Sequence, residues 1–456
     1  MNSVKNTDML SGPLAKKIIL FTLPIALSSI IQQLFNAADT AIVGLFGNSD
    51  ALAAVGTNTE TVALTVTVSS GLSIGTNVLV ANRIGKKRLN DIPSAVSTSV
   101  LLAAVIGIVF SAVCQLCAEP LLELIKTPDD IFSAAESYLR IYIIGIPFLL
   151  LYDFGAAVLR ARGNSRYPFT ALVISGAVNV ALNLIFVAVF DWDVAGVSAA
   201  TDISTAFAAF SVLRKLKKDG CLKPSSKKDL FGSEYVAEIL KTGIPSAIQG
   251  AVFCFANIFV QAAVNRFGTA AIAGSAAAMN FEYFSYYIIT AFCQTATTFT
   301  GQNYSAKQYG RCKKILLLCL SFLIISSLLT IVPNVIFRYR LSAIFSDDPT
   351  VIENAAKRIM CILLFEPLCN LFEIPTGTLR GTGHASLAAA DTVIGTCVFR
   401  IVWIFTVFRA HPSLEVLYIA FPLSWVVTIT LVAISLACAN PFRSSDMQQK
   451  KPSLEK

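Results

Sequence analysis

The chain alternates between long apolar runs and short polar stretches through most of its 456 residues. Most runs reach about 20 residues, the length that a helix needs to cross a bilayer. Helices are the only open element that can do so, because each backbone amide must find its partner within its own segment. The pattern predicts an all-α membrane protein with twelve transmembrane helices. The predicted spans are Ile18–Gly44, Ala51–Val80, Ala95–Cys117, Tyr138–Leu159, Phe169–Phe190, Val194–Leu213, Val236–Val264, Ala270–Thr300, Ile315–Phe337, Ile359–Leu379, Leu387–Phe408 and Leu414–Ala437.

The second half of the chain repeats the first. Moving the sequence along itself by 221 residues places Pro24 on Pro245 and Asn36 on Asn257, and other landmarks follow in nearly the same register. They include Gly47 and Gly268, Asn82 and Asn303, Lys86 and Lys307, Pro128 and Pro349, and, at an offset of 220, Leu159 and Leu379. Each copy holds six spans, so we expect two pseudo-symmetric six-helix bundles, a recurring plan of transporters whose substrate site lies between the halves.

This repeat sets the expected domain organisation. Residues 1–213 form a first lobe with helices 1 to 6, and residues 235–440 form a second lobe with helices 7 to 12. Between them, residues 214–234 contain RKLKKDGCLKPSSKKD and are predicted to be a cytoplasmic linker. Residues 441–456 form a polar, charged tail that is expected to be disordered.

Composition and charge agree with a membrane protein. The chain is 55% hydrophobic and 14% charged, whereas soluble domains are about 25% charged. Most Lys and Arg residues fall in one set of alternate loops, and the opposite loops carry only five, Lys126, Arg266, Arg338, Arg340 and Arg409. This asymmetry predicts a multi-pass protein of the cell membrane with both termini in the cytoplasm. The net charge of +8 then needs no nucleic acid to explain it.

Several chemistries find no support in the sequence. No Walker-type phosphate loop is present, so we expect no use of ATP. The two histidines, His384 and His411, lie near loops and assemble neither a metal site nor a catalytic triad. Cys114 and Cys117 form a C-x-x-C on an apolar helix, where packing explains them better than metal or disulfide. We therefore expect no cofactor and no enzyme activity.

The first span is the richest in polar residues. Ser28, Gln32, Asn36 and Asp39 recur at spacings of four, four and three, so they share one helical face. Pro24 lies just before them and is the expected hinge of a bend. Asp39 has two interpretations. It can reach water from the outer end of the helix, or it can face an internal cavity where it loads and unloads a proton.

The fifth span adds a pair of amides. Asn179 and Asn183 lie one turn apart and could hydrogen-bond Asp39 in either protonation state, or ligate a cation through carbonyl oxygens. Packing between helices is the competing interpretation, and the two are compatible.

A second set of acids lies near the cytoplasmic helix ends. Asp153 in the fourth span and Glu373 in the tenth span are repeat mates. We expect them to be structural partners of Arg160 and Arg380, which follow one to two turns later.

The second and eighth spans are too polar to face lipid on all sides. The second is rich in Thr and Ser, and the eighth carries Glu282, Tyr283, Phe284, Tyr286, Tyr287, Phe292 and Gln294. We expect both to line a central cavity, with Gln32 and Asn36. Aromatic walls with one carboxylate suit large, flat organic cations. Ordinary packing at helix interfaces is the alternative for the aromatic residues.

The chain also resembles the multidrug and toxic compound extrusion (MATE) family from about Leu14 to Ala437. The stretches that carry this resemblance are LPIALSSIIQQLFNAADTAIVG, GLSIGTNVLVANRIGKKR, VLRARGNSRYP, NVALNLIF, TFTGQNYSAKQYGRCKK and TLRGTGHAS. The resemblance implies two bundles that form a V around a central cavity. It also implies alternating access and export of drug-like, often cationic compounds against an inward flow of protons or sodium.

The resemblance further implies a cation-coupling site. The family's helix-one acid corresponds to Asp39, its helix-five pair to Asn179 and Asn183, and a tyrosine and a threonine to Tyr138 and Thr201. Some members carry an Asp where this chain has Asn183, so the first lobe here has one carboxylate fewer. A branch that uses acids in the second lobe is disfavoured, because the seventh span has none, and Glu282 in the eighth span is the one candidate left for such a role.

We therefore expect a secondary active multidrug efflux antiporter. It is embedded in membrane lipid, and its substrates are small organic compounds. A proton is the expected coupling ion, with sodium as the other choice, and a monomer suffices. A lipid-linked oligosaccharide flippase of the related superfamily is the alternative. It should have a strongly basic cavity, whereas the basic residues within spans are few, Arg400 being the clearest. A membrane-embedded enzyme or scaffold would need a polar cluster at one membrane face or large loops.

Overall fold

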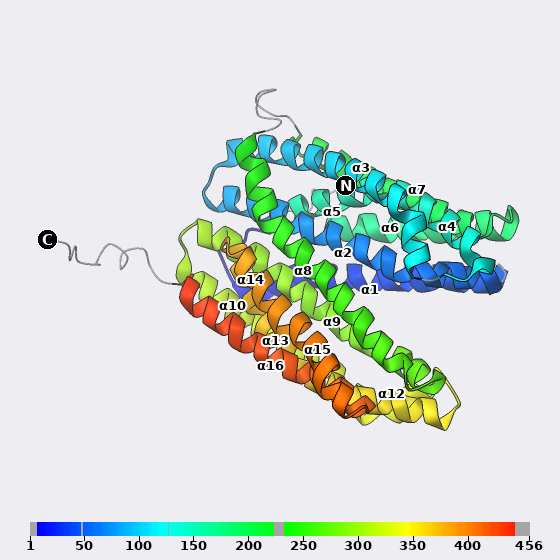
Figure 1. Cartoon of the computed structure of the whole chain (residues 1–456). Helices are drawn as coiled ribbons and strands as arrows, with labels where there is room; N and C mark the ends of the chain where they lie inside the picture. The colour runs from blue at the N-terminus through cyan, green and yellow to red at the C-terminus, as the bar shows by residue number, and fades with distance from the viewer. Residues whose placement is uncertain (1–6, 47–48, 126, 223–231, 443–456) are drawn as a thin grey trace. The chain divides into compact units, whose positions relative to one another are not determined.

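The described part of the chain is built from helices. The computed structural model describes residues 7–46, 49–125, 127–222 and 232–442, and these ranges contain no β-strand. The longer helices in chain order are α1 (Leu14–Phe46), α2 (Ser49–Gly85), α3 (Ile92–Leu124), α4 (Asp129–Ile144), α5 (Ile146–Ala161), α6 (Arg166–Asn183), α7 (Asp193–Lys218), α8 (Ser233–Asn265), α9 (Thr269–Ser305), α10 (Tyr309–Ile336), α12 (Pro349–Cys361), α13 (Pro367–Gly381), α14 (Ala385–Thr392) and α16 (Leu414–Ala439) (Figure 1). Two five-residue helices, α11 (Arg338–Ser342) and α15 (Phe399–Trp403), complete the set.

Each of the twelve predicted spans falls on helical residues. Nine helices in the described ranges are long and apolar enough to cross a membrane, and the bent pairs α4–α5 and α12–α13 pass the same test when each pair is taken together. The remaining predicted span, Ala270–Thr300, lies within α9. This helix has 37 residues, but its sequence is rich in Thr, Tyr, Gln and Asn, and it does not pass the same test.

The fourth and tenth spans differ from the prediction. The helices begin at Asp129 and Pro349, nine or ten residues earlier than expected, and each pair is bent, by 43° at Gly145 and by 45° before Pro367. The early turns carry charged residues, which hid them from a search for apolar runs. The bends follow from proline, which lacks the N–H needed for the helical hydrogen bond.

The duplication is visible in the backbone. Helices α2 and α9 both have 37 residues. The turns that follow them repeat a left-handed residue, Lys87 at φ 56° and Lys307 at φ 59°. The turns after α5 and α13 likewise share Gly163 at φ 85° and Gly383 at φ 91°. The offset in both turns is 220, so the register of 221 expected for Lys86 is one residue too large here.

Clustering of contacts divides the chain into two units. Unit 1 contains Leu23–Ile84 and Arg88–Gly250, and unit 2 contains Asp8–Thr22, Gly85–Lys87 and the described residues from Ala251 onward. The division therefore falls inside α1 and inside α8, whereas the predicted domain boundaries follow the sequence repeat and remain a prediction.

Within unit 1, α5 and α6 pack on α7, and α3 packs on both α5 and α4. Helix α2 lies against the first half of α8 through small residues. A Cβ added to Gly75 would stand 2.0 Å from the carbonyl oxygen of Ile239, and one added to Gly71 would stand 2.6 Å from Cα of Ala247. Glycine at these two positions is what allows the two helix backbones to approach so closely.

Within unit 2, α9 is the central element. It packs against α10, α12 and α13, and α13 also packs against α16. Close approach again depends on glycine, because a Cβ on Gly377 would lie 2.6 Å from the carbonyl oxygen of Cys293.

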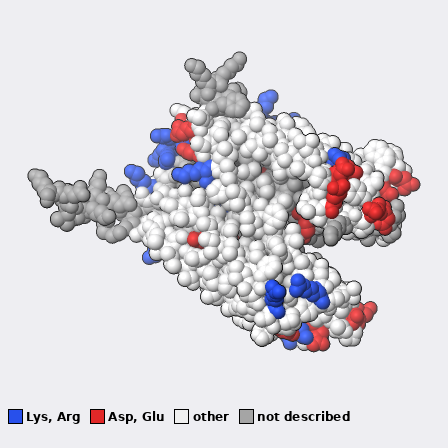
Figure 2. Space-filling view, viewed as in Figure 1, with Lys and Arg blue, Asp and Glu red and all other residues white. Residues whose placement is uncertain are grey.

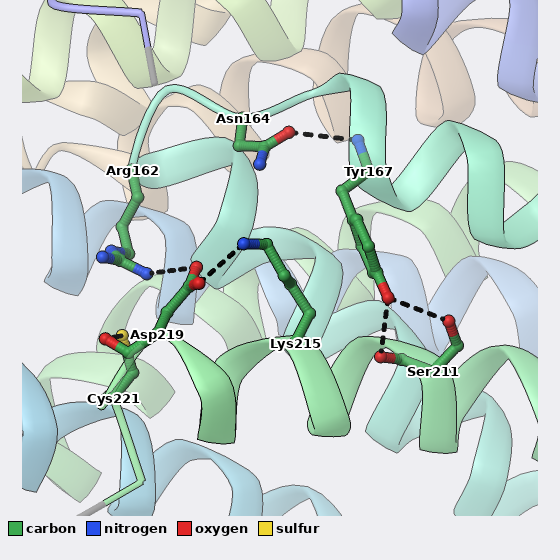
Figure 3. Close-up of polar contacts among 7 residues, drawn as sticks. All are labelled: Arg162, Asn164, Tyr167, Ser211, Lys215, Asp219 and Cys221. Carbon is green, nitrogen blue, oxygen red and sulfur yellow. Dashed lines mark hydrogen bonds and ion pairs between the residues drawn. The ribbon is translucent and has the colours of Figure 1, made fainter. Parts of the chain in front are cut away.

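Polar contacts fix the end of α7 in unit 1 (Figure 3). Asp219 accepts from Arg162 at 3.1 Å and from Lys215 at 2.6 Å, and the Asn164 side chain accepts from the backbone N–H of Tyr167. Residues 214–218, expected to begin a linker, are thus helical, as is Glu234 at the other end. Residues 223–231 of the predicted linker and most of the predicted tail lie outside the described residues.

Charge is concentrated near helix ends. On the face shown in Figure 2, Lys, Arg, Asp and Glu gather toward the ends of helices, and a broad surface between them is nearly free of charge. An uncharged surface of this kind is what a bilayer requires.

We predict that Gly75→Ala lowers the melting temperature of the detergent-purified protein, because the new methyl group collides with α8. Overpacking of this kind costs roughly 1–3 kcal/mol. Gly56→Ala in the same helix is the matched control, since a Cβ there meets nothing within 4 Å. It should leave the melting temperature unchanged or raise it slightly. Equal effects of the two substitutions would contradict the tight α2–α8 contact.

Candidate functional site

An acid and an amide meet in unit 1. Asp39 in α1 is half-buried, and its Oδ1 atom accepts a hydrogen bond from the Nδ2 atom of Asn183 in α6 at 2.5 Å. Asn183 itself is fully buried. Two residues predicted from separate spans to belong to one site are therefore in direct contact.

The contact continues as a chain of hydrogen bonds. Asn183 also donates to the Oδ1 atom of Asn179 at 3.3 Å, and Asn179 donates to the hydroxyl of Thr201 in α7 at 3.3 Å. Thr201 is a second hydrogen-bond partner of Asp39. Four of the five predicted cation-coupling residues thus form one network, which joins α1, α6 and α7.

Local backbone features position this network. Asn183 is the last residue of α6, and the chain continues as a π-helical segment, Leu184–Val189. Such π-segments often occur at functional sites. One turn before Asn179, Gly176 leaves room for the ring of Phe35, since an added Cβ would stand 1.7 Å from it. Because Phe35 is one turn before Asp39, this contact brings α1 close to α6.

Tyr138, the fifth predicted residue, lies nearby. Its side chain is buried in α4, stacks on Tyr142 at 6.3 Å, and is near enough to Asp39 and Asp202 to experience their charges. Ser198 of α7 donates to the Tyr138 carbonyl oxygen at 2.8 Å, which ties α4 to the same helix that carries Thr201.

Asp202 is an acid of unit 1 that the sequence analysis overlooked. It follows Thr201 and lies against the bend between α4 and α5, where the Gly145 backbone hydrogen-bonds its carboxylate. A Cβ on Gly145 would stand 2.0 Å from its Oδ1 atom. It is the one acid in the predicted span Val194–Leu213, so the rule that singled out Asp39 would also have found it. The first lobe therefore has a further carboxylate near Thr201, although not at position 183.

The other polar residues of α1 have varied environments. Gln32 and Asn36 are exposed on the surface, whereas Ser28 donates to the carbonyl oxygen of Pro24 at 2.7 Å. A serine bond of this kind, to the carbonyl four residues earlier, favours bending of the helix. Helix α1 is nevertheless continuous through Pro24, so the hinge remains a prediction.

The polar residues of α2 mostly face their own unit. Ser69 donates to Asp153 at 2.6 Å, Asn77 donates to the backbone of α5, and Asn58 donates to that of α4. Interhelical hydrogen bonding thus explains much of the polarity that was expected to line a cavity. It also gives Asp153 a partner other than the expected Arg160, which acts on it only through its charge.

The aromatic residues predicted in α9 belong to unit 2. Tyr283 is exposed and stacks on Tyr287, Tyr286 stacks on Phe253, and Phe292 is buried. Phe292 is therefore a packing residue. Glu373 likewise hydrogen-bonds Cys293 within this unit and experiences the charge of Arg380.

Glu282 is not the free carboxylate that was expected. Both its oxygens accept from Arg358 of α12, at 2.7 and 2.8 Å, and the pair is largely buried. A bidentate arginine neutralises the carboxylate. The attraction for organic cations that the sequence analysis assigned to Glu282 is therefore removed.

Comparison with known proteins identifies the family. The MatE family model matches residues 24–185 and again residues 245–406, which together are more than two thirds of the chain. The chain belongs to the MatE family. The two matches begin 221 residues apart, as the internal repeat requires, and the family is one of membrane transporters rather than enzymes. This MatE protein is accordingly a multi-pass membrane protein.

Individual relatives agree. The chain is similar to the probable multidrug resistance protein YpnP of Bacillus subtilis (strain 168), with 29% identity over 66% of this chain and 67% of YpnP. It is also similar to the multidrug export protein MepA of Staphylococcus aureus (strain N315), with 20% identity over 94% and 92% of the two chains. The crystal structure of MATE in complex with MaL6 superposes with a TM-score of 0.88 at 18% identity, covering 98% of this chain and 100% of that one. The twelve-helix, two-lobe fold expected from the sequence is confirmed.

We predict that Gly176→Ala lowers transport by this MatE protein on the order of tenfold, equivalent to about 1.4 kcal/mol, by pushing Phe35 and the α1 segment with Asp39 away from Asn183. The measurement is dye export from cells at matched expression. Adding Phe35→Leu should restore most of the transport, because the smaller side chain makes room for the methyl group. A double variant as impaired as the single one would contradict this role of the Phe35–Gly176 contact.

Proposed function

We propose that this MatE protein is a secondary active multidrug exporter, in which an inward flow of protons drives organic compounds out of the cell. Coupling takes place at Asp39 and its partners Asn183, Asn179 and Thr201. Family membership and the names of YpnP and MepA support the transport of drugs. The hydrogen-bond network in unit 1 supports the choice of the coupling site.

The observation that carries the proposal is the neutrality of the partners of Asp39. Its hydrogen bonds in the described structure come from an amide and a hydroxyl, and no arginine or lysine pairs with it. A carboxylate held by a cation would stay ionised through the cycle. A half-buried carboxylate whose partners are neutral can instead be protonated and deprotonated during the cycle.

Asn183 can serve both states of the carboxyl group. Its Nδ2 atom donates to ionised Asp39, while its Oδ1 atom is buried without a hydrogen-bond partner among the described residues. An amide carries donors on one side and an acceptor on the other. Rotation of this amide would turn the unused oxygen toward Asp39, ready to accept the proton of the neutral acid.

A transport cycle follows from these two states. With the site open to the outside, Asp39 takes up a proton, its bond to Asn183 rearranges, and α1 moves through the segment that contains Pro24. Loss of the proton toward the cytoplasm returns the network to the arrangement seen here. The drug leaves on the outward step and the proton enters on the return, so both fluxes share one conformational change.

Sodium is the other ion that this geometry could accept. Carboxylate and amide oxygens are ligands for hard cations, and the Oδ1 atoms of Asp39 and Asn179 both accept from the Nδ2 atom of Asn183. The proton is favoured because Asn179 and Asn183 use their amide nitrogens, not their oxygens, to contact Asp39 and Thr201.

We predict that Asp39→Asn abolishes drug export, because the residue can no longer gain or lose a proton. Ethidium efflux would be followed in right-side-out vesicles, with a proton gradient and a sodium gradient imposed separately. The wild-type protein should respond to the proton gradient and the variant to neither.

Glu119→Gln is the matched control, since it removes an exposed carboxylate of α3 that lies 3.7 Å from Arg140, outside the network. It should export ethidium normally. Normal export by correctly folded Asp39→Asn would overturn the coupling site. Efflux driven only by sodium would replace the ion but keep the site, and wild-type protein that exports no dye under either gradient would direct attention to lipid-linked substrates.

A further inference from the structure

Unit 2 contains a buried arginine without an acidic partner. Arg400 in α15 is 2% exposed, and its only hydrogen bond in the described structure runs from Nε to the hydroxyl of Ser424 in α16 at 3.1 Å. No carboxylate of the described residues forms an ion pair with it. Its two terminal nitrogens donate to no described residue. In other proteins these nitrogens often bind the two oxygens of a carboxylate or phosphate.

Two other buried arginines of this protein, Arg83 and Arg358, are paired with acids. Arg83 pairs with Glu238 at 3.0 Å, and Arg358 makes two bonds to Glu282 and one to Ser275. Burying a guanidinium is costly unless a charge and hydrogen bonds compensate for the lost water. Arg83 and Arg358 therefore follow the rule, and Arg400 is the exception.

Aromatic rings surround Arg400 instead. Its guanidinium carbon lies 4.0 Å from the ring centre of Phe421 and 6.0 Å from those of Phe253 and Trp425. These faces attract a cation and hold it flat. They leave its N–H groups, which point outward from the edge of the planar group, without acceptors.

Nearby titratable groups cannot supply the missing charge. The groups whose charges act on Arg400 are the thiols of Cys369 and Cys397, the carboxylate of Glu282 and the guanidinium of Arg358. A thiol is a weak acceptor, and both oxygens of Glu282 are already taken by Arg358. The terminal nitrogens of Arg400 are also not among the completely enclosed atoms that lack a hydrogen bond, so part of their surface is accessible.

We infer that Arg400 is a binding site for an oxyanion, with Ser424 orienting the guanidinium and Phe253, Phe421 and Trp425 holding its plane. The ligand is a carboxylate attached to an aromatic ring, because the two terminal N–H groups match a carboxylate and the flanking rings match an aromatic body. As a substrate site this rests on the proposed export function, and it narrows the substrates to aromatic compounds that carry an acid group.

The anion site can be tested without transport. Benzoate should raise the melting temperature of the protein purified in a phosphate-free maltoside, and benzamide, its neutral analogue, should not. Arg400→Gln should abolish the benzoate shift. Arg340→Gln, which removes an exposed arginine of α11, is the control and should keep it. A wild-type protein that responds equally to benzoate and benzamide would overturn the site.

Transport provides the second arm. A rhodamine with a free carboxylate and its methyl ester would be compared in vesicles. The wild-type protein should prefer the free acid, and Arg400→Gln should lower export of the acid on the order of tenfold while export of the ester stays unchanged. Equal loss of both dyes would indicate a structural role and contradict the proposal. A benzoate shift without export of either dye would retain the anion site and refute the proposed export function.

One further variant and one competition experiment keep the test decisive. If Arg400→Gln fails to fold, Arg400→Lys keeps the charge but loses the planar pair of terminal nitrogens. It should weaken the benzoate shift while leaving the protein stable.

Adding a short-chain anionic phospholipid tests the other source of an oxyanion. The lipid could abolish the melting-temperature shift caused by benzoate when it is present at a lower concentration than benzoate. That result would assign the site to a lipid phosphate and overturn its assignment to substrate.

Discussion

A polar side chain within the hydrocarbon region needs its partner inside the protein, because the surrounding lipid offers none. This constraint explains why so many hydroxyls bond to the carbonyl oxygen four residues earlier, as Thr22 does to Ile18 and Thr295 to Ala291. It also explains where helices can break. The bend at Gly145 is tolerated because Asp202 reaches its backbone, and α6 changes to a π-helix directly after Asn183. Polar residues in these helices therefore mark places where the backbone departs from regular geometry.

The two halves keep the same backbone but differ in charge. Turns with matching left-handed residues recur after α2 and α9 and after α5 and α13. In unit 1 the half-buried acids Asp39 and Asp202 contact amides, hydroxyls and backbone. In unit 2 the position equivalent to Tyr138 at an offset of 220 is Arg358, and Arg400 is a second buried arginine. Duplication thus preserved the scaffold, while substitution of a few side chains gave each half its own chemistry.

The sequence was sufficient for those features that depend on local patterns. Apolar runs located all twelve spans, and the spacing of polar residues on one face singled out Asp39, with Asn179 and Asn183 following from the next rich span. What escaped prediction depends on contacts between distant segments. The first turns of α4 and α12 carry charged residues, so a search for apolar runs does not include them in a membrane span. No pattern within α9 shows that Glu282 is neutralised, because its partner lies in α12, 76 residues later. The Phe35–Gly176 contact is likewise invisible until two helices are placed side by side.

Pairing Glu282 with Arg358 changes which compounds unit 2 can accept. A free Glu282 among tyrosines would attract simple organic cations. With that charge neutralised, the unit retains the uncompensated charge of Arg400, and arginine does not lose its proton in proteins. A compound with only a positive charge would be repelled there, whereas one that also carries a carboxylate would meet both the aromatic rings and the guanidinium. In the proposed cycle the charge of Asp39 varies, whereas that of Arg400 does not. The group proposed to respond to the driving ion is therefore separate from the group proposed to select the substrate.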